Sequence, residues 1–215
     1  SQKDKIIYLQ KNTSDEGWED EVKKYNPDVV VHTAWQIRHM YHNEATEWKW
    51  NIDGTDRVFD FAFSHPTVKK LIHFSTVASY GAFADNTIDH FYKEEEGFRE
   101  SGYLYAEEKR ISELHLEERY KNAQEKGWQG QVFIVRPAAI TGPRGRYDRI
   151  RFGRQSALSG NLHGGFAYRI VTLLTSFVPV TSKWLRQYIH EDDVCDIVAL
   201  FSFNDLEGSY EVFNI

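Results

Sequence analysis

Apolar and polar positions along the chain follow an alternating order of strands and helices. Short runs of β-branched and other apolar residues predict strands at 5–10, 29–32, 70–75, 132–136 and 211–215. Longer stretches whose apolar positions recur with helical spacing predict helices at 15–25, 45–63, 103–125 and 191–203. Strands that alternate with helices of this length are typical of a parallel sheet with right-handed crossovers. We therefore expect an α/β fold.

Small or polar residues stand at the carboxyl ends of three predicted strands. They are Thr33 and Ala34, Ser75 and Thr76, and Pro137, Ala138 and Ala139. In parallel sheets, ligands bind beyond the carboxyl ends of the strands. We therefore expect a functional site at this edge of the sheet.

The pattern changes after Gly142. The stretch 142–183 is rich in Gly, Arg and Ser, with one apolar patch at 170–180. We expect it to leave the sheet and to build part of a second, smaller lobe. Five arginines cluster between Arg144 and Arg154. They form either a solvated basic loop, which we favour, or a site for an anionic group such as a phosphate.

Composition narrows the classes of function. A net charge of −6 argues against nucleic acid as a partner. No apolar run approaches the roughly 20 residues that a membrane span needs, and the start of the chain lacks a signal-peptide pattern. A single cysteine, Cys195, excludes an internal disulfide and fits a reducing compartment, so we expect a cytoplasmic protein. Its apolar helical surroundings predict a buried structural thiol.

Histidine spacing gives no metal site. His39 and His42 stand three residues apart, but no acidic or cysteine partner falls at a recognisable ligand spacing. We expect no bound metal.

Tyr105 and Lys109 stand four apart in a predicted helix, and Thr76 ends a strand upstream. Residues four apart share one helix face. A lysine ammonium near a phenol favours the phenolate, so the tyrosine could act as an acid or base nearer neutral pH. A threonine hydroxyl could hold the same substrate oxygen. The alternative is a surface helix whose lysine stem covers a tyrosine ring.

The order of the motifs around this trio resembles the extended short-chain dehydrogenase/reductases, the family of NAD-dependent epimerases and dehydratases. The segments are PDVVVHTAW (27–35), NIDGT (51–55), HFSTVASYG (73–81), YAEEK (105–109), VRPAAITGP (135–143) and RQYIHEDDV (186–194). Each is weak alone, but together they span nearly the whole chain in the family's order.

The resemblance implies catalytic roles for three residues. Thr76 matches the Ser or Thr that orients the substrate, with neighbouring Ser75 as the second candidate. Tyr105 matches the catalytic acid/base. Lys109 matches the lysine that binds the nicotinamide ribose and lowers the pKa of the tyrosine.

The resemblance also implies binding residues. The expected contacts with NAD or NADP are Asn12, Thr33, Ala34, Trp35, Asn51, Ser75, Tyr105, Lys109, Pro137, Ala138 and Ala139. Thr76 and Arg186 are expected to bind the substrate. Arg186 matches an arginine that binds a substrate phosphate in members acting on nucleotide sugars, and a surface salt bridge is its alternative role.

Three departures from the family pattern qualify this picture. The glycine-rich fingerprint that seats the cofactor pyrophosphate is absent, and the chain begins at what resembles the family's third strand. Ala139 replaces an asparagine that often touches the nucleotide sugar. Asn12 stands where an acidic residue usually meets the adenine end. If the upstream strands are missing from the protein, cofactor binding should fail.

The expected fold is a Rossmann-like doubly wound parallel sheet, incomplete at the N-terminus, with a small C-terminal substrate lobe. Residues 1–141 would form a partial dinucleotide-binding domain, and 142–215 mainly the substrate lobe, with segments returning to the sheet. The helices 45–63 and 103–125 match those through which the family dimerises, so a homodimer is expected.

The expected function is NAD(P)-dependent oxidoreduction, epimerisation or dehydration at a hydroxyl or carbonyl carbon, with a nucleotide sugar as a candidate small-molecule substrate. Two alternatives stay open. One is a reductase of a small carbonyl compound, and the other is a non-catalytic cofactor-binding sensor or scaffold of the same fold.

Overall fold

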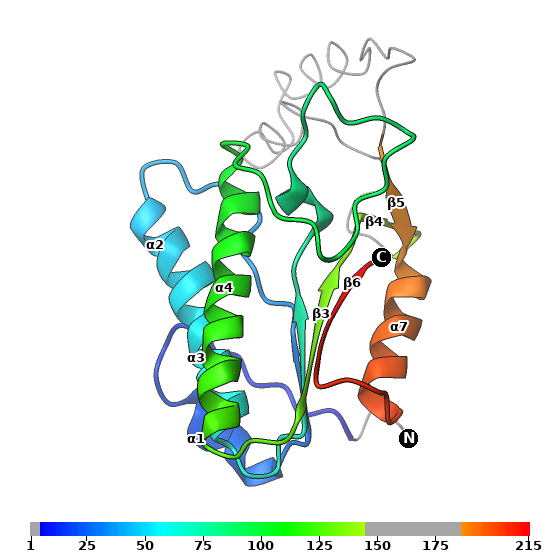
Figure 1. The fold of residues 1–215 in the computed structure, drawn as a ribbon. Helices are drawn as coiled ribbons and strands as arrows, with labels where there is room; N and C mark the ends of the chain where they lie inside the picture. The colour runs from blue at the N-terminus through cyan, green and yellow to red at the C-terminus, as the bar shows by residue number, and fades with distance from the viewer. Residues whose placement is uncertain (1–4, 145–185) are drawn as a thin grey trace.

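Four parallel strands form the centre of the molecule, which we describe from a computed structural model for residues 5–144 and 186–215. They are β1 (Val29–His32), β2 (Lys70–Phe74), β3 (Gln131–Arg136) and β6 (Tyr210–Asn214), in the spatial order β1-β2-β3-β6 (Figure 1). All three neighbouring pairs are parallel. A second, two-stranded parallel sheet pairs β4 (Ala139–Thr141) with β5 (Tyr188–His190). The predicted α/β class is confirmed.

Helices cover both faces of the main sheet (Figure 1). One face carries α2 (Glu44–Trp48), a π-helical turn (Lys49–Asp53), α3 (Gly54–Ser64) and α4 (Leu104–Glu125). The other face carries α7 (Glu191–Phe203). Shorter elements are α1 (Trp18–Val22) and the 3₁₀ turns η2 (Lys23–Tyr25) and η4 (Val77–Tyr80).

Two hydrophobic clusters fill the space between these layers. Val132 and Ile134 of β3 pack with Phe59 and Leu116 of the α3–α4 layer. Phe133, the residue between them, packs with the α7 layer. Successive side chains of a strand point to opposite faces. Both faces of β3 are therefore buried, which explains its continuous apolar run.

The segment 5–10 departs from the prediction, because these residues form no strand. Ile7 is 58% exposed, and within the described residues β1 has a paired neighbour on only one side, β2. A strand needs a neighbouring strand to satisfy its backbone hydrogen bonds, and an apolar run alone does not supply one. The helix predicted at 15–25 is also shorter, with α1 and a 3₁₀ turn in its place.

Three further predictions have different outcomes. Cys195 is exposed, so the expected buried thiol is wrong; α7 buries its neighbour Val194 and, two turns on, Phe201. Of the arginine cluster, only Arg144 lies within the described residues, where it pairs with Glu191 and Asp192. The apolar patch 170–180 lies outside them, so the division at residue 141/142 stays a prediction. No helix within residues 5–144 and 186–215 is long and apolar enough to cross a membrane.

Candidate active site

The carboxyl end of β2 brings Thr76 to Tyr105. Thr76 is buried and begins the η4 turn, where its side chain accepts a hydrogen bond from the amide of Ala78 at 3.1 Å. The Thr76 side chain also interacts with the Tyr105 phenol in the first turn of α4, where it lowers the pKa of this phenol. Ser79 strengthens this junction, since its hydroxyl donates to the carbonyl oxygen of Ala106 at 3.3 Å. Two of the three predicted catalytic side chains therefore meet.

Burial raises the pKa of the Tyr105 phenol, and the interaction with Thr76 partly opposes this rise. The phenol is therefore protonated at neutral pH. The lowering of the Tyr105 pKa by Lys109, which the resemblance implied, is not seen in this arrangement, because the Lys109 ammonium is directed elsewhere.

Lys109 is only 3% exposed. Its ammonium donates a hydrogen bond to the carbonyl oxygen of Phe74, the last residue of β2. It also lies over the indole ring of Trp35, with 3.6 Å between Nζ and the ring centroid. Burial lowers the pKa of Lys109 to about 7, against the opposing effect of the carboxylates of Glu113 and Glu108.

Asn51 connects the loop after β1 to α4. It is fully buried within the π-helical turn, a kind of irregularity that often marks functional sites. Its Oδ1 accepts from the amide of Gln36 at 2.7 Å, and its Nδ2 donates to the Gln36 carbonyl at 3.1 Å and to Glu108 Oε2 at 2.6 Å. Asn51 thus fixes the backbone next to Trp35 relative to the helix that carries Tyr105 and Lys109.

The strand ends hold most of the other predicted cofactor contacts. Thr33 and Ala34 are exposed beyond β1, whereas Ser75 is buried at the end of β2. Pro137 is buried, and its carbonyl oxygen accepts from the amide of Val77 at 3.2 Å, which joins the end of β3 to η4.

The remaining predicted site residues are Ala138, Ala139, Asn12 and Arg186. Ala138 is buried and pairs with Ile215 through its amide, whereas Ala139 is exposed in β4. Asn12 accepts two hydrogen bonds from Ser14 within its own turn. Arg186 is exposed at the approach to β5.

A buried polar cluster beside the site was not assigned a role from the sequence, although two of its members lie in the quoted motifs. The guanidinium of Arg136 pairs with both carboxylate oxygens of Glu113, at 3.0 and 2.6 Å. It also donates to the hydroxyl of Tyr80 at 2.6 Å, and this hydroxyl in turn lies 3.0 Å from Asn214 Oδ1. The cluster therefore ties the η4 turn to β3, α4 and β6. Its partners come from distant parts of the chain, so local sequence gives no signal for it.

Two buried histidines lie near enough to Lys109 to feel its charge. His32 Nε2 lies 2.9 Å from Thr55 Oγ1, and His73 Nε2 lies 3.1 Å from Ser112 Oγ. Burial and the nearby Lys109 ammonium lower both pKa values, that of His32 to about 3. Among the described residues, no group of three or more His, Cys, Asp or Glu side chains could hold a metal ion.

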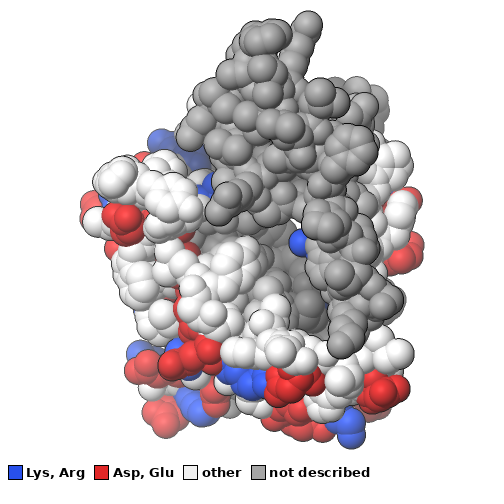
Figure 2. Space-filling model, turned by 90° about the horizontal axis from the view of Figure 1, so that it is seen from above, with Lys and Arg blue, Asp and Glu red and all other residues white. Residues whose placement is uncertain are grey.

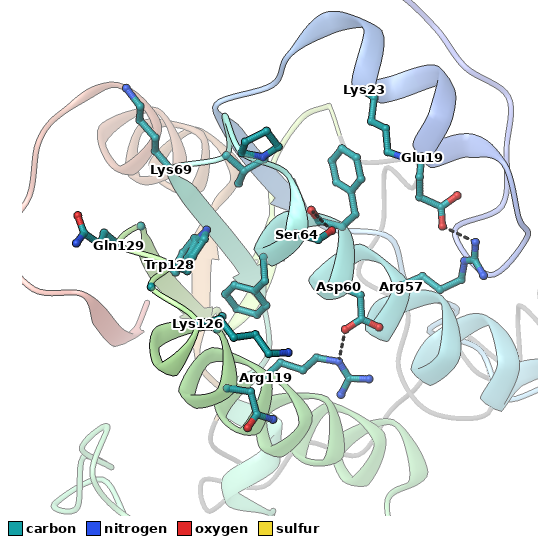
Figure 3. A pocket seen from close by; sticks show the side chains of 18 of the residues that line it. Glu19, Lys23, Arg57, Asp60, Ser64, Lys69, Arg119, Lys126, Trp128 and Gln129 are labelled. Carbon is teal, nitrogen blue, oxygen red and sulfur yellow. Dashed lines mark hydrogen bonds and ion pairs between the residues drawn. The ribbon is translucent and has the colours of Figure 1, made fainter.

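A large groove lies at the other end of the sheet (Figure 3). It has a volume of about 1410 Å³ and is lined by α1, the ends of α3 and α4, and the turns that lead into β2 and β3. Its charged side chains largely pair with one another, as Arg57 does with Glu19 and Arg119 with Asp60. None of the predicted site residues lines it.

Seen from the end at which the strands finish, the described charged residues gather toward the edge of the molecule, with both signs mixed (Figure 2). Within the described surface in this view there is no broad basic area of the kind that binds nucleic acid.

Solved structures share this fold. One is the Bordetella bronchiseptica enzyme WbmG in complex with NAD, which is 21% identical, with 96% of this chain and 56% of that chain covered and a TM-score of 0.63. A second is dTDP-glucose 4,6-dehydratase from Bacillus anthracis in complex with NAD, at 19% identity, 97% and 58% coverage and a TM-score of 0.66. A third is UDP-glucose 4-epimerase from Thermotoga maritima with UDP-glucose, at 21% identity, 98% and 62% coverage and a TM-score of 0.67.

The chain thus spans about six tenths of the length of these structures. No curated protein matches its sequence. The model of the NAD dependent epimerase/dehydratase family matches residues 2–215, almost the entire chain. The parallel sheet with helices on both faces is the Rossmann-like arrangement that the motifs implied. The chain belongs to the NAD-dependent epimerase/dehydratase family.

Proposed function

We propose that the complete protein is an NAD(P)-dependent enzyme that oxidises, epimerises or dehydrates at a hydroxyl or carbonyl carbon of a small-molecule substrate. The observation that carries this proposal is the interaction of the Thr76 side chain with the Tyr105 phenol at the carboxyl edge of the sheet, with buried Lys109 one helical turn further on. Membership of the family supports it, and the sequence carries Thr76, Tyr105 and Lys109, to which we assign the catalytic roles.

The residues at this edge fit a nicotinamide cofactor. The hydroxyl of Ser75, at the end of β2, is buried and has no hydrogen-bond partner among the described residues. Buried polar groups normally find partners, so this hydroxyl indicates a polar ligand at the strand edge. Thr33 and Ala34 leave the backbone beyond β1 accessible, and Asn51 holds the following loop in place. When bound, the cofactor supplies the ring carbon that takes up or returns a hydride.

The chain's own residues handle the proton. Tyr105, protonated at neutral pH, can donate a proton to a substrate carbonyl oxygen. In the reverse direction, its phenolate form can take a proton from a substrate hydroxyl. Thr76 can hold the same oxygen, because its hydroxyl already contacts the phenol. The ammonium of Lys109 supplies positive charge one turn away and would favour the phenolate once it faces the cleft.

A nucleotide sugar is the substrate class that we propose. Two of the three similar structures described above are a dTDP-glucose 4,6-dehydratase and a UDP-glucose 4-epimerase. Arg186 is proposed to bind a substrate phosphate and Ala139 to line the sugar side, while a small carbonyl compound remains the alternative substrate. Assays with UDP- and dTDP-sugars beside small aldehydes and ketones separate the two classes.

Replacing Tyr105 with Phe in the complete protein tests the catalytic assignment. We expect turnover to fall by roughly 10²–10⁴-fold, the usual contribution of general acid–base catalysis, while NAD(P) binding measured by calorimetry stays within about twofold of wild type. Tyr103→Phe, a neighbouring tyrosine that is more than half exposed, is the matched control and should stay active. Full activity of the Tyr105→Phe protein would refute the assignment.

A non-catalytic cofactor-binding sensor is the second candidate. One observation favours it, namely that the Lys109 ammonium is covered by Trp35. Wild-type turnover with any substrate of the panel would exclude it.

The finer parts of the proposal concern cofactor choice, assembly and location. NAD is favoured over NADP, because structures of the same fold hold NAD. We propose a homodimer through α2–α3 and α4, and a cytoplasmic location that agrees with the single cysteine. Residues 1–141 would hold the cofactor and 142–215 mainly the substrate.

A further inference from the structure

The indole ring of Trp35 occupies one side of the Lys109 ammonium. The ring centroid lies 3.6 Å from Nζ, and the Phe74 carbonyl oxygen accepts one of the three N–H groups. Together these contacts leave Lys109 only 3% exposed. A lysine that is to bind the hydroxyls of a ribose needs its remaining N–H groups free. The face of the Trp35 ring is thus in contact with the Lys109 ammonium, the group that the proposed function requires for binding the cofactor.

Hydrogen bonds hold the backbone beside Trp35, whereas the Trp35 indole N–H makes none within the described residues. Gln36 is clamped by two hydrogen bonds to fully buried Asn51, so the loop cannot shift as a whole without breaking them. The Trp35 indole N–H, by contrast, is buried and lacks a partner among the described residues. A buried unpaired donor costs free energy, which is recovered when the ring turns toward water or meets an acceptor. The contact with the ammonium therefore favours the observed position of the ring, whereas the burial of its unpaired N–H group disfavours it.

We propose that Trp35 is a positioning residue that covers Lys109 and must turn away before the ammonium can bind the cofactor ribose. This proposal rests on the proposed function. It predicts that part of the binding free energy of the cofactor is used to break the indole–ammonium contact, since affinity falls with the fraction of protein in the competent state. It also removes the conflict between a covered lysine and a cofactor-dependent enzyme.

The test measures access to Lys109 directly, without cofactor. At pH 9.5 most of the Lys109 amine is neutral in the wild-type protein, because its pKa is about 7. The rate of its acylation, followed by mass spectrometry of the peptide that carries it, then reports exposure. Trp35→Ala should raise this rate at least about tenfold, and Trp35→Phe, which keeps an aromatic face, should raise it less. Trp48→Ala removes an indole that is 42% exposed on α2 and serves as the matched control with wild-type labelling.

The second measurement is the dissociation constant of NAD⁺ for the full-length protein by calorimetry. Trp35→Ala should bind NAD⁺ about 3- to 30-fold more tightly than wild type, a range that corresponds to a cation–π contact. Unchanged labelling and unchanged or weaker NAD⁺ binding in Trp35→Ala would overturn the role of Trp35 while leaving the proposed function intact. A wild-type protein that binds no NAD⁺ would instead refute the proposed function, and the labelling result would still decide whether Trp35 covers Lys109.

Discussion

At the residue scale, the protonation of Lys109 is the most unusual property of the site. Its ammonium lies between an indole ring and a backbone carbonyl, and burial outweighs the two carboxylates that favour the charged form. The cation–π contact compensates only part of the lost hydration. A neutral amine forms readily near pH 7, so the charge that the proposed mechanism uses depends on what covers the lysine.

This buried lysine should make folding stability depend on pH. The folded-state pKa of about 7 lies below the unfolded value of about 10.4, so between these two values the unfolded chain binds the extra proton. The contribution of Lys109 to the free energy of unfolding therefore rises by about 2–4 kcal/mol as the pH increases from 7 to 10. The measurement is urea unfolding of wild type and of Lys109→Met at both pH values. Their difference in unfolding free energy should grow at high pH in favour of wild type, and a constant difference would contradict the prediction.

At the scale of elements, the π-helical turn between α2 and α3 places Asn51 where two layers meet. Replacing Asn51 with Asp keeps the shape but removes both donated hydrogen bonds, to the Gln36 carbonyl and to Glu108. It also sets a second carboxylate beside Glu108, whose pKa burial already raises. When folding raises the pKa of a carboxyl group, the folded protein loses stability as the pH rises from the unfolded pKa of this group to its folded pKa.

Asn51→Asp should therefore destabilise the protein by about 2–4 kcal/mol at pH 8 and by less at pH 5, where the pair can share a proton. Asn51→Ala, which removes the hydrogen bonds without adding charge, should show a smaller dependence on pH. Thermal or urea unfolding of the two variants at both pH values checks this. Equal pH dependence of the two variants would mean that like-charge repulsion plays no part.

The local pattern of apolar and polar residues correctly predicted the helices and strands that pack or pair with other elements of this chain. The bounds of the helix 191–203 and the strand 29–32 agree with the structure, and 45–63 is helical apart from the π turn. The segment 5–10 failed because pairing, which an apolar run cannot reveal, decides whether a strand forms. In the site, motif order led to the meeting of Thr76 and Tyr105. The Trp35–Lys109 contact depends on side-chain directions across 74 positions of sequence, which no local rule gives.

At the scale of the whole molecule, the outer face of α3 and α4 is the surface through which we propose that the protein dimerises. Its charges largely neutralise one another, since His115 and Arg119 of α4 both pair with Asp56 of α3. Leu114, beside them on α4, is 54% exposed. Charges that are already paired need no partner, so a second copy can dock around the apolar side chain at a small desolvation cost.

We expect the complete protein to sediment as a homodimer at micromolar concentration, and Leu114→Glu to shift it toward the monomer. A glutamate at this position would meet its symmetry mate or a buried apolar surface, and either contact opposes association because the charge loses hydration without a partner. Ile88→Glu is the matched control, as Ile88 is 66% exposed on the loop between η4 and α4, away from this face. Sedimentation velocity of the three proteins decides the matter. A wild-type monomer, or a dimer that Leu114→Glu leaves unchanged, would place the assembly surface elsewhere, and the paired charges between α3 and α4 would then serve only to hold these two helices together.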